Sequence, residues 1–414
     1  MPKKNILVIT PYPLYPADSG GRIGILSSIF PTCEQYNYHL LACATRNELD
    51  AMNKNRDNLY EQYYKAFKSI TFVDRPRMPH EMTKMNAMKH LLFHTLKKFP
   101  LMDVSYYTAD MVREAKKIVK EKHIDLIEIH HLHMAFIKRY FRKMPSIMVN
   151  HNLETNLFPY WNKNGKGLGA YIWNMFGRIS RRNGHAIEIM NKLKFDCNAY
   201  VSVKEMEHVK HVYGKKVWLP TSFVLNKTEK KFNTDTVRLL WVGGFNWQPN
   251  VEAADWFTRF VWPLLSKRSE AIEVDFVGEN PPPELTLHSN RRNLRVHGFV
   301  EDLDEFWNNA DVFIVPLLSG GGIRVKILEA LNYGIPVVST TKGCEGLPYV
   351  YGEHLMATDD PAEFAKFILL LSNSVLLRER FSRNGREYIC KNHSQERIAA
   401  IKNEMYEGAL YKYV

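Results

Sequence analysis

The residues best suited to chemistry are a glycine loop and the charged side chains that follow it. Ser319–Gly322 supplies three consecutive glycines, and Arg324, Lys326 and Glu329 come next. Glycines leave backbone N–H groups open to a ligand, and the start of a helix favours an anion. Two cations there oppose the usual helix preference, which points to a function. The stretch indicates a site for a phosphate and a sugar diol; the alternative is a tight loop with a solvated basic turn.

The elements that must position this loop are two strands and a helix. The apolar run Val312–Val315 predicts a buried parallel strand, and Val325–Leu331 has apolar residues at helical spacing. Ile335–Thr340 predicts the next strand. The loop therefore joins the carboxyl end of a strand to the start of a helix within a strand–helix–strand unit.

A second glycine loop follows the first predicted strand of the chain. Ile6–Thr10 is a short apolar run, Gly20 and Gly21 follow it, and a helical pattern begins after Arg22. The loop lacks a dinucleotide fingerprint, so it predicts either a ligand loop or a plain strand-to-helix turn. His151 ends another predicted strand, where α/β proteins bind ligands. A hydrogen-bonded structural histidine is the alternative there.

Length, charge and composition limit the class of protein. The 414 residues predict two or three domains, and the 45% hydrophobic content is that of a globular chain. The formal charge of +12 fits a phosphate-rich ligand, an acidic membrane surface or a nucleic acid. No helix-turn-helix, zinc-finger or aromatic stacking signature is present, so we expect no nucleic-acid partner.

Cysteines and apolar runs indicate the compartment. The five cysteines form no Cys-x-x-Cys pair, which favours a reducing environment. No run resembles a signal peptide or a spanning helix, so we expect a cytoplasmic protein. The basic helical segment Met88–Phe99 either contacts the inner membrane face or packs on its own sheet. His130, His131 and His133 lack carboxylates at a fitting spacing, so we expect no metal.

Strand and helix patterns alternate along the whole chain. This alternation predicts an α/β fold with parallel sheets. The polar segment Asn226–Thr236 predicts a linker between two halves, and Asn250 is a predicted N-cap. The segment Ser394–Val414 predicts a final helix with apolar residues on one side.

Several segments of the second half, in this order and spacing, resemble glycosyltransferase family 4, the group 1 glycosyl transferases of the GT-B fold. They are Trp241–Gly244, Phe276–Gly278, Val296–Val300, Asp311–Pro316, Gly320–Ala330, Gly334–Thr340 and Gly343–Leu347. The first half is similar to the family more loosely, through Gly20–Gly21, His151–Asn152 and Val201–Glu205.

The resemblance implies two Rossmann-like, doubly wound parallel-sheet domains that face each other across a cleft. Residues 1–222 would bind the acceptor, residues 223–392 the nucleotide-sugar donor, and residues 393–414 would form a helix that crosses back to the first domain. Transfer in the family retains the anomeric configuration and needs no metal or other cofactor. The implied partners are a nucleotide-diphosphate sugar and a glycan or lipid-linked glycan acceptor.

The resemblance also assigns roles to individual positions. Glu329 matches the glutamate that binds the ribose, Gly298–Val300 the segment at the base, and His151 a histidine beside the donor sugar. The implied donor-binding set is Gly20, Gly21, Gly243, Gly244, Gly298, Phe299, Val300, Gly321, Gly322, Ile323 and Glu329; the catalytic set is His151, Arg324 and Lys326.

Two departures from the family pattern affect the mechanism. Gly321 stands where the family has a sugar-contacting glutamate, and residues 244–250 contain no arginine or lysine. We therefore hypothesise that Arg324 and Lys326 neutralise the leaving diphosphate. The expected function is retaining sugar transfer in cell-surface polysaccharide, glycolipid or glycan assembly. The alternatives are a nucleotide-sugar epimerase on the same fold and a catalytically degenerate scaffold.

Overall fold

The computed structural model divides the chain into two compact units. It describes residues 2–17, 19–54, 61–75, 108–151, 186–267, 271–288, 293–320 and 322–412. Unit 1 comprises Met1–Ser222 together with Ile398–Val414, and unit 2 comprises Phe223–Arg397. The predicted helix Met88–Phe99 and the loop residue Gly321 lie outside the described residues.

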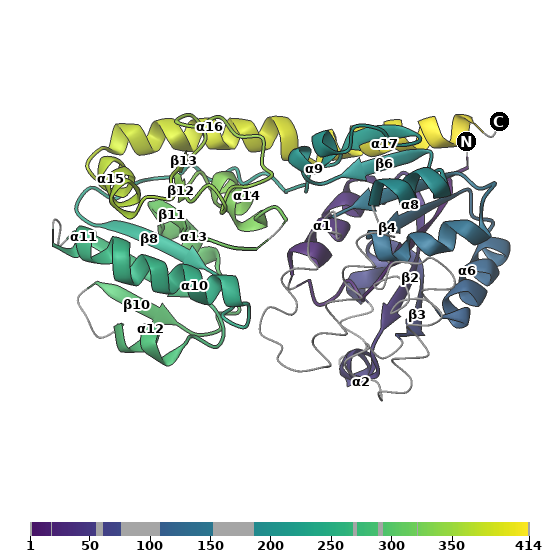
Figure 1. The fold of residues 1–414 in the computed structure, drawn as a ribbon, viewed down its shortest axis with the longest axis horizontal. Helices are drawn as coiled ribbons and strands as arrows, with labels where there is room; N and C mark the ends of the chain where they lie inside the picture. The colour runs from purple at the N-terminus through teal and green to yellow at the C-terminus, as the bar shows by residue number, and fades with distance from the viewer. Residues whose placement is uncertain are drawn as a thin grey trace. The chain divides into compact units, whose positions relative to one another are not determined.

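Unit 1 is built on one parallel sheet of seven strands, in the order β3-β2-β1-β4-β5-β6-β7 (Figure 1). The strand order reverses between β1 and β4, which makes the sheet doubly wound. The strands are β1 Asn5–Thr10, β2 Asn37–Ala44, β3 Phe67–Asp74, β4 Leu126–His130, β5 Ser146–Asn150, β6 Cys197–Tyr200 and β7 Lys215–Trp218.

Helices cover both faces of this sheet. Leu7 and Ile9 of β1 join the hydrophobic cluster on one face, while Ile6 and Val8 join the cluster on the other. Burial of both faces explains why the central strand β1 has the continuous apolar run Ile6–Ile9. The described helices are α1 Gly20–Ile29, η1 Phe30–Thr32, α2 Arg46–Lys54, α6 Ala109–Glu121, η3 Leu132–Tyr140, α8 Ala186–Leu193, α9 Val203–His208 and α17 Gln395–Tyr411.

Unit 2 repeats the architecture with six parallel strands, in the order β10-β9-β8-β11-β12-β13 (Figure 1). The order reverses between β8 and β11. The strands are β8 Val237–Val242, β9 Ile272–Val277, β10 Leu294–His297, β11 Val312–Val315, β12 Val337–Ser339 and β13 Met356–Ala357. The α/β fold class expected from the sequence, with two doubly wound parallel sheets, is therefore confirmed.

The unit 2 sheet is also buried on both faces. Val312 and Ile314 of β11 point into one apolar cluster, and Phe313 and Val315 into the other. The helices that cover the sheet are α10 Gln248–Trp256, η5 Phe257–Val261, α11 Trp262–Ser266, α12 Pro283–His288, α13 Asp304–Asn309, α14 Val325–Asn332, α15 Pro361–Ser372 and α16 Val375–His393.

The last helix, α17, packs on unit 1. Ile398, Ile401 and Met405 are buried in the same cluster as β1 and α1. Because these residues recur at helical spacing, the apolar stripe in the sequence determines which face of α17 is buried. In the part of the chain that the structure describes, no helix is both long and apolar enough to span a bilayer.

Candidate functional site

The unit 2 candidate residues lie on loops that follow the carboxyl ends of parallel strands. Gly243 and Gly244 follow β8, Gly298 follows β10, and the loop Ser319–Gly322 follows β11. Since β8 and β11 flank the reversal of strand order, their loops border the crevice where open α/β sheets bind ligands. Lys326, on the helix α14 that follows the glycine loop, reaches the end of β8, because its Nζ donates to the Val242 carbonyl at 2.7 Å.

The glycine loop takes a conformation that favours glycine at two described positions. Gly320 has φ of +101° and Gly322 has φ of +74°, both in the region where a Cβ is unfavourable. A Cβ on Gly320 would also lie 2.7 Å from the Trp247 ring. The turn itself therefore favours glycine at Gly320 and Gly322, independently of any ligand.

Arg324 holds the glycine loop from inside. Its Nη1 donates to the Gly322 carbonyl at 3.0 Å, its Nη2 lies 3.4 Å from the Ser319 carbonyl, and its guanidinium stacks over Trp247 at 5.3 Å. Burial lowers the pKa of Arg324, and the Glu345 carboxylate partly offsets that effect. The sequence predicts Arg324 in the first turn of the helix. In the structure it is the N-cap residue of α14, just before that turn.

Lys326 and Glu329 are half-buried side chains of opposite charge on α14. Burial lowers the pKa of Lys326 to about 8; Glu329 opposes this, and Arg324 adds to it. Burial likewise raises the pKa of Glu329, and Lys326 partly offsets that rise. Among the described residues, none hydrogen-bonds the Glu329 carboxylate. The carboxylate is therefore available to accept bonds from hydroxyl groups of a ligand.

The loop after β8 is fixed by close packing. A Cβ on Gly243 would lie 2.8 Å from both Asn250 Nδ2 and the Trp241 ring. Asn250 Nδ2 donates to the Gly244 carbonyl at 2.7 Å. The predicted N-cap role of Asn250 is wrong, because α10 begins at Gln248 and Trp247 is the N-cap. Asn250 instead anchors the loop after β8 from within α10.

The three remaining unit 2 candidates differ in exposure. Gly298 has open space where a Cβ would be, and Phe299 is 76% exposed. Val300 and Ile323 are partly buried against the apolar cluster that includes α14. The loop after β10 therefore leaves backbone groups accessible beside Gly298, as a contact to a nucleotide base through the backbone requires.

The unit 1 candidates gather at the corresponding reversal, between β1 and β4. Gly20 and Gly21 begin α1. A Cβ on Gly21 would lie 2.4 Å from the Tyr12 hydroxyl, so glycine is needed for close approach. Tyr12 Oη lies 2.7 Å from His131 Nε2, and the His131 ring stacks on that of His151 with centroids 4.5 Å apart. The structure thus brings Gly21 and His151 into one connected site.

His151 is a buried, neutral histidine at the end of β5. It is 7% exposed. Burial holds the pKa of His151 well below the usual value, and the neighbouring His131, His130 and His133 add to this effect. Its Nε2 lies 2.9 Å from His130 Nδ1. A cationic His151 is therefore disfavoured, so the ring can act as a hydrogen-bonding group but does not carry charge near neutral pH.

Sequence reasoning did not assign Tyr12, Glu128 or His130 to this site, and it considered His130 only as a possible metal ligand. Tyr12 follows β1 directly, and Glu128 and His130 sit two residues apart on β4, which places them on the same face of the strand. The two-residue spacing of Glu128 and His130 was a sequence signal that their side chains lie together. Across the described residues, no group of three His, Cys, Asp or Glu side chains is placed to hold a metal ion.

Comparison with known proteins adds a family match for the second unit. Residues 236–374 match the family model for glycosyl transferases group 1. Over 413 residues, the chain is 23% identical to an uncharacterized 44.6 kDa protein in the cps region of Klebsiella pneumoniae, covering 95% of this chain and 97% of that protein.

Solved structures resemble both units together. Sucrose-phosphate synthase from Thermosynechococcus elongatus has a TM-score of 0.64 at 14% identity and covers 99% of this chain and 100% of its own. HepE from Anabaena in complex with UDP has a TM-score of 0.63 at 12% identity, covering 97% and 98%. A TarM variant of S. aureus with fondaparinux, α-GlcNAc-glycerol and UDP has a TM-score of 0.60 at 12% identity, covering 97% and 99%. The fold is therefore GT-B, and residues 236–374 of it carry the group 1 glycosyl transferase match.

Proposed function

We propose that this protein is a retaining glycosyltransferase, as in glycosyltransferase family 4, that moves a sugar from a nucleotide-diphosphate sugar to a hydroxyl acceptor. One observation carries the proposal: the glycine loop, Lys326 and Glu329 meet at the strand reversal of unit 2, within the region that matches group 1 glycosyl transferases. Phosphate-binding N–H groups, a cation and a ribose-binding carboxylate are what a sugar nucleotide requires.

The proposed donor site divides the work among the loops of unit 2. The N–H groups of Gly321 and Gly322, with Ile323 behind them and the start of α14, bind the diphosphate. Glu329 accepts hydrogen bonds from the ribose hydroxyls, and the backbone of Gly298–Val300 contacts the base. Gly243 and Gly244 form the opposite wall of the same crevice.

Unit 1 contributes the second set of proposed contacts. The family resemblance assigns Gly20 and Gly21 to the diphosphate and His151 to the donor sugar. Because His151 is neutral, it orients the sugar by hydrogen bonding.

The proposed transfer step needs no protein base and no metal. The acceptor oxygen attacks the anomeric carbon from the face that the diphosphate leaves; the new carbon–oxygen bond forms as the bond to the phosphate oxygen breaks. The leaving oxygen takes the acceptor proton. Lys326 stabilises the charge that grows on the diphosphate, and Arg324 keeps the loop N–H groups aligned while adding its own charge.

A donor screen followed by product analysis tests the proposal. Thermal shifts with UDP-, GDP-, ADP- and CMP-sugars identify the donor, and UDP-sugars come first because HepE was solved with UDP and UDP-glucose. Proton NMR of the product with a sugar acceptor should show the donor's anomeric configuration. Conversion of the donor sugar without any acceptor would establish an epimerase. Binding without turnover would establish a degenerate scaffold.

We further propose that the acceptor is a glycan or lipid-linked glycan of the cell surface, handled on the cytoplasmic side. The relative from a cps region supports polysaccharide assembly, and the charge of +12 suits contact with an anionic inner membrane face. Flotation with phosphatidylglycerol-containing vesicles should carry the protein upward, and neutral vesicles should not. Equal recovery in the bottom fraction with both would reject the membrane contact.

A further inference from the structure

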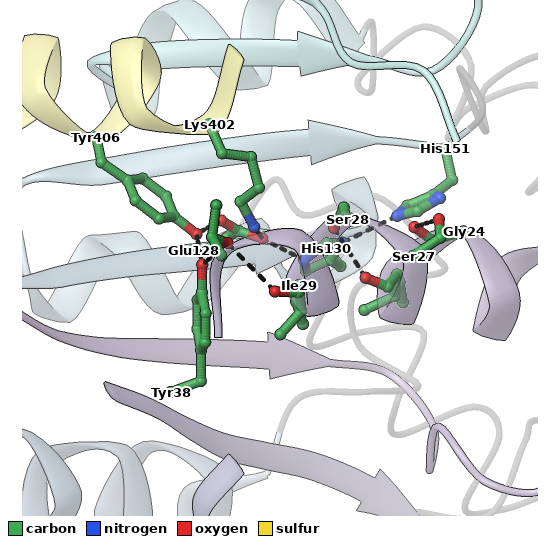
Figure 2. A network of polar contacts seen from close by, with 12 residues as sticks. Gly24, Ser27, Ser28, Ile29, Tyr38, Glu128, His130, His151, Lys402 and Tyr406 are labelled. Carbon is green, nitrogen blue, oxygen red and sulfur yellow. Dashed lines mark hydrogen bonds and ion pairs between the residues drawn. The ribbon is translucent and has the colours of Figure 1, made fainter. Parts of the chain in front are cut away.

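A fully buried polar chain reaches from the C-terminal helix to His151, and the proposed function does not account for it. Glu128 of β4 accepts hydrogen bonds from Lys402 Nζ at 3.0 Å and from His130 Nε2 at 2.8 Å (Figure 2). The Tyr406 hydroxyl also donates to this carboxylate. His130 Nδ1 then meets His151 Nε2 at 2.9 Å.

The first link of the chain is an ionised carboxylate. Burial would raise the pKa of Glu128, but the Lys402 ammonium and the hydrogen bonds from His130 and Tyr406 hold it well below its usual value. An ionised carboxylate can only accept hydrogen bonds. His130 must therefore carry its proton on Nε2, the nitrogen that faces Glu128.

The protonation of His130 determines that of His151. Burial lowers the pKa of His130, with Glu128 opposing and Lys402 adding to the effect, so the ring is neutral. A neutral imidazole with its proton on Nε2 has an unprotonated Nδ1. This Nδ1 faces His151 Nε2, which must therefore be the donor. His151 is then protonated on Nε2, and its Nδ1 keeps a free lone pair.

We propose that Glu128 and His130 are positioning residues that fix His151 in the Nε2-protonated tautomer, so that His151 Nδ1 accepts a hydrogen bond from a hydroxyl of the bound sugar. This proposal rests on the proposed function, because the hydrogen-bond partner that it assigns to His151 Nδ1 is a hydroxyl of the donor sugar. Lys402 and Tyr406 hold the carboxylate at the far end of the chain. The C-terminal helix α17 is thus part of the support of the site.

Two features favour this role over a purely structural one. A buried ion pair contributes little net stability compared with apolar side chains of the same size, so stability alone does not explain it. The chain also ends in an accepting atom: within the residues that the structure describes, no group donates to His151 Nδ1.

Two double variants separate the positioning role from the ion pair. Glu128→Leu with Lys402→Met removes the pair and leaves nothing to accept the His130 proton. Glu128→Gln with Lys402→Met removes the same two charges but keeps an amide oxygen as acceptor. If the Glu128–Lys402 ion pair served only folding, both double variants would show the same His151 tautomer and the same kcat.

The first readout is the tautomer of His151, from ¹⁵N NMR of histidine-labelled protein, assigned by comparison with His151→Gln. We expect the Nε2-protonated form in the natural protein and in the glutamine variant, and loss of that form in the leucine variant. An Nδ1-protonated His151 in the natural protein would overturn the proposal. This readout needs no activity, so it stands even if sugar transfer is never observed.

The second readout is turnover with the donor that the nucleotide-sugar screen identifies. The leucine variant should lose roughly tenfold or more in kcat, the effect of one lost hydrogen bond to a reacting ligand, while the glutamine variant stays within about threefold. Equal kcat values for the two folded variants would also overturn the proposal. Thermal unfolding of both variants confirms that the compared proteins are folded.

Discussion

Lys326 provides the sharpest test of the proposed donor site, because its charge titrates in an accessible pH range. Burial holds its pKa at about 8, below the ordinary value of 10.5. A bound diphosphate places negative charge beside the ammonium and raises that pKa towards the ordinary value. Binding then takes up a proton, so the affinity falls as the pH rises through about 8.

The size of the effect follows from the two pKa values. If the pKa returns to about 10.5 in the complex, raising the pH from about 7 to about 9 weakens binding about tenfold. Isothermal titration calorimetry with the nucleoside diphosphate of the preferred donor measures this. Titrations in two buffers with different ionisation enthalpies also count the proton taken up near pH 8.

The matched control is Lys326→Met, which keeps a long apolar side chain without the charge. Nucleotide bases also titrate at high pH, and that contribution persists in the variant. We expect the variant to bind more weakly at pH 7 and to lose most of the pH dependence. The same tenfold fall in both proteins would refute the assignment of Lys326 to the diphosphate.

Three further predictions concern single positions. Gly21→Ala should destabilise the protein by about 1–3 kcal/mol in urea unfolding, because its Cβ would meet the Tyr12 hydroxyl at 2.4 Å; adding Tyr12→Phe should recover most of the loss, and no recovery would contradict the contact. Glu329→Gln should weaken nucleotide binding roughly tenfold, but by little for a 2′-deoxyribose analogue; equal losses with both sugars would rule out the ribose contact. Arg324→Ala should lower kcat at least tenfold, and Arg324→Lys should not restore it, because only a guanidinium reaches both loop carbonyls; a fully active lysine variant would reject this bracing role.

The sequence alone determined the architecture of both units. The runs Ile6–Ile9 and Val312–Val315 are apolar at every position, and each buries both faces in the structure. That pattern is local, because burial on both sides of a strand demands apolar residues without alternation. The same applies to α14 and α17, whose apolar stripes predicted where each helix lies.

The sequence also located the loops that we propose bind the donor, since it showed which residues follow each strand. It could not show how their side chains would be used. Arg324 turns to the loop carbonyls and to Trp247, and Lys326 reaches the end of β8. Asn250 holds a glycine carbonyl and does not cap its helix. Each of these depends on an atom presented by another loop or helix, which no local spacing encodes.

The clearest contribution of the tertiary structure is the chain from Lys402 to His151. Lys402 and Glu128 are 274 residues apart in sequence and in hydrogen-bond contact in the fold. Neither residue shows a pattern that announces its partner, because a lysine on a helix is usually solvated and a glutamate in a strand usually faces water. The fold buries both side chains. Because a buried carboxylate is costly without partners, Glu128 is stable there only with the Lys402 ammonium and the His130 imidazole beside it.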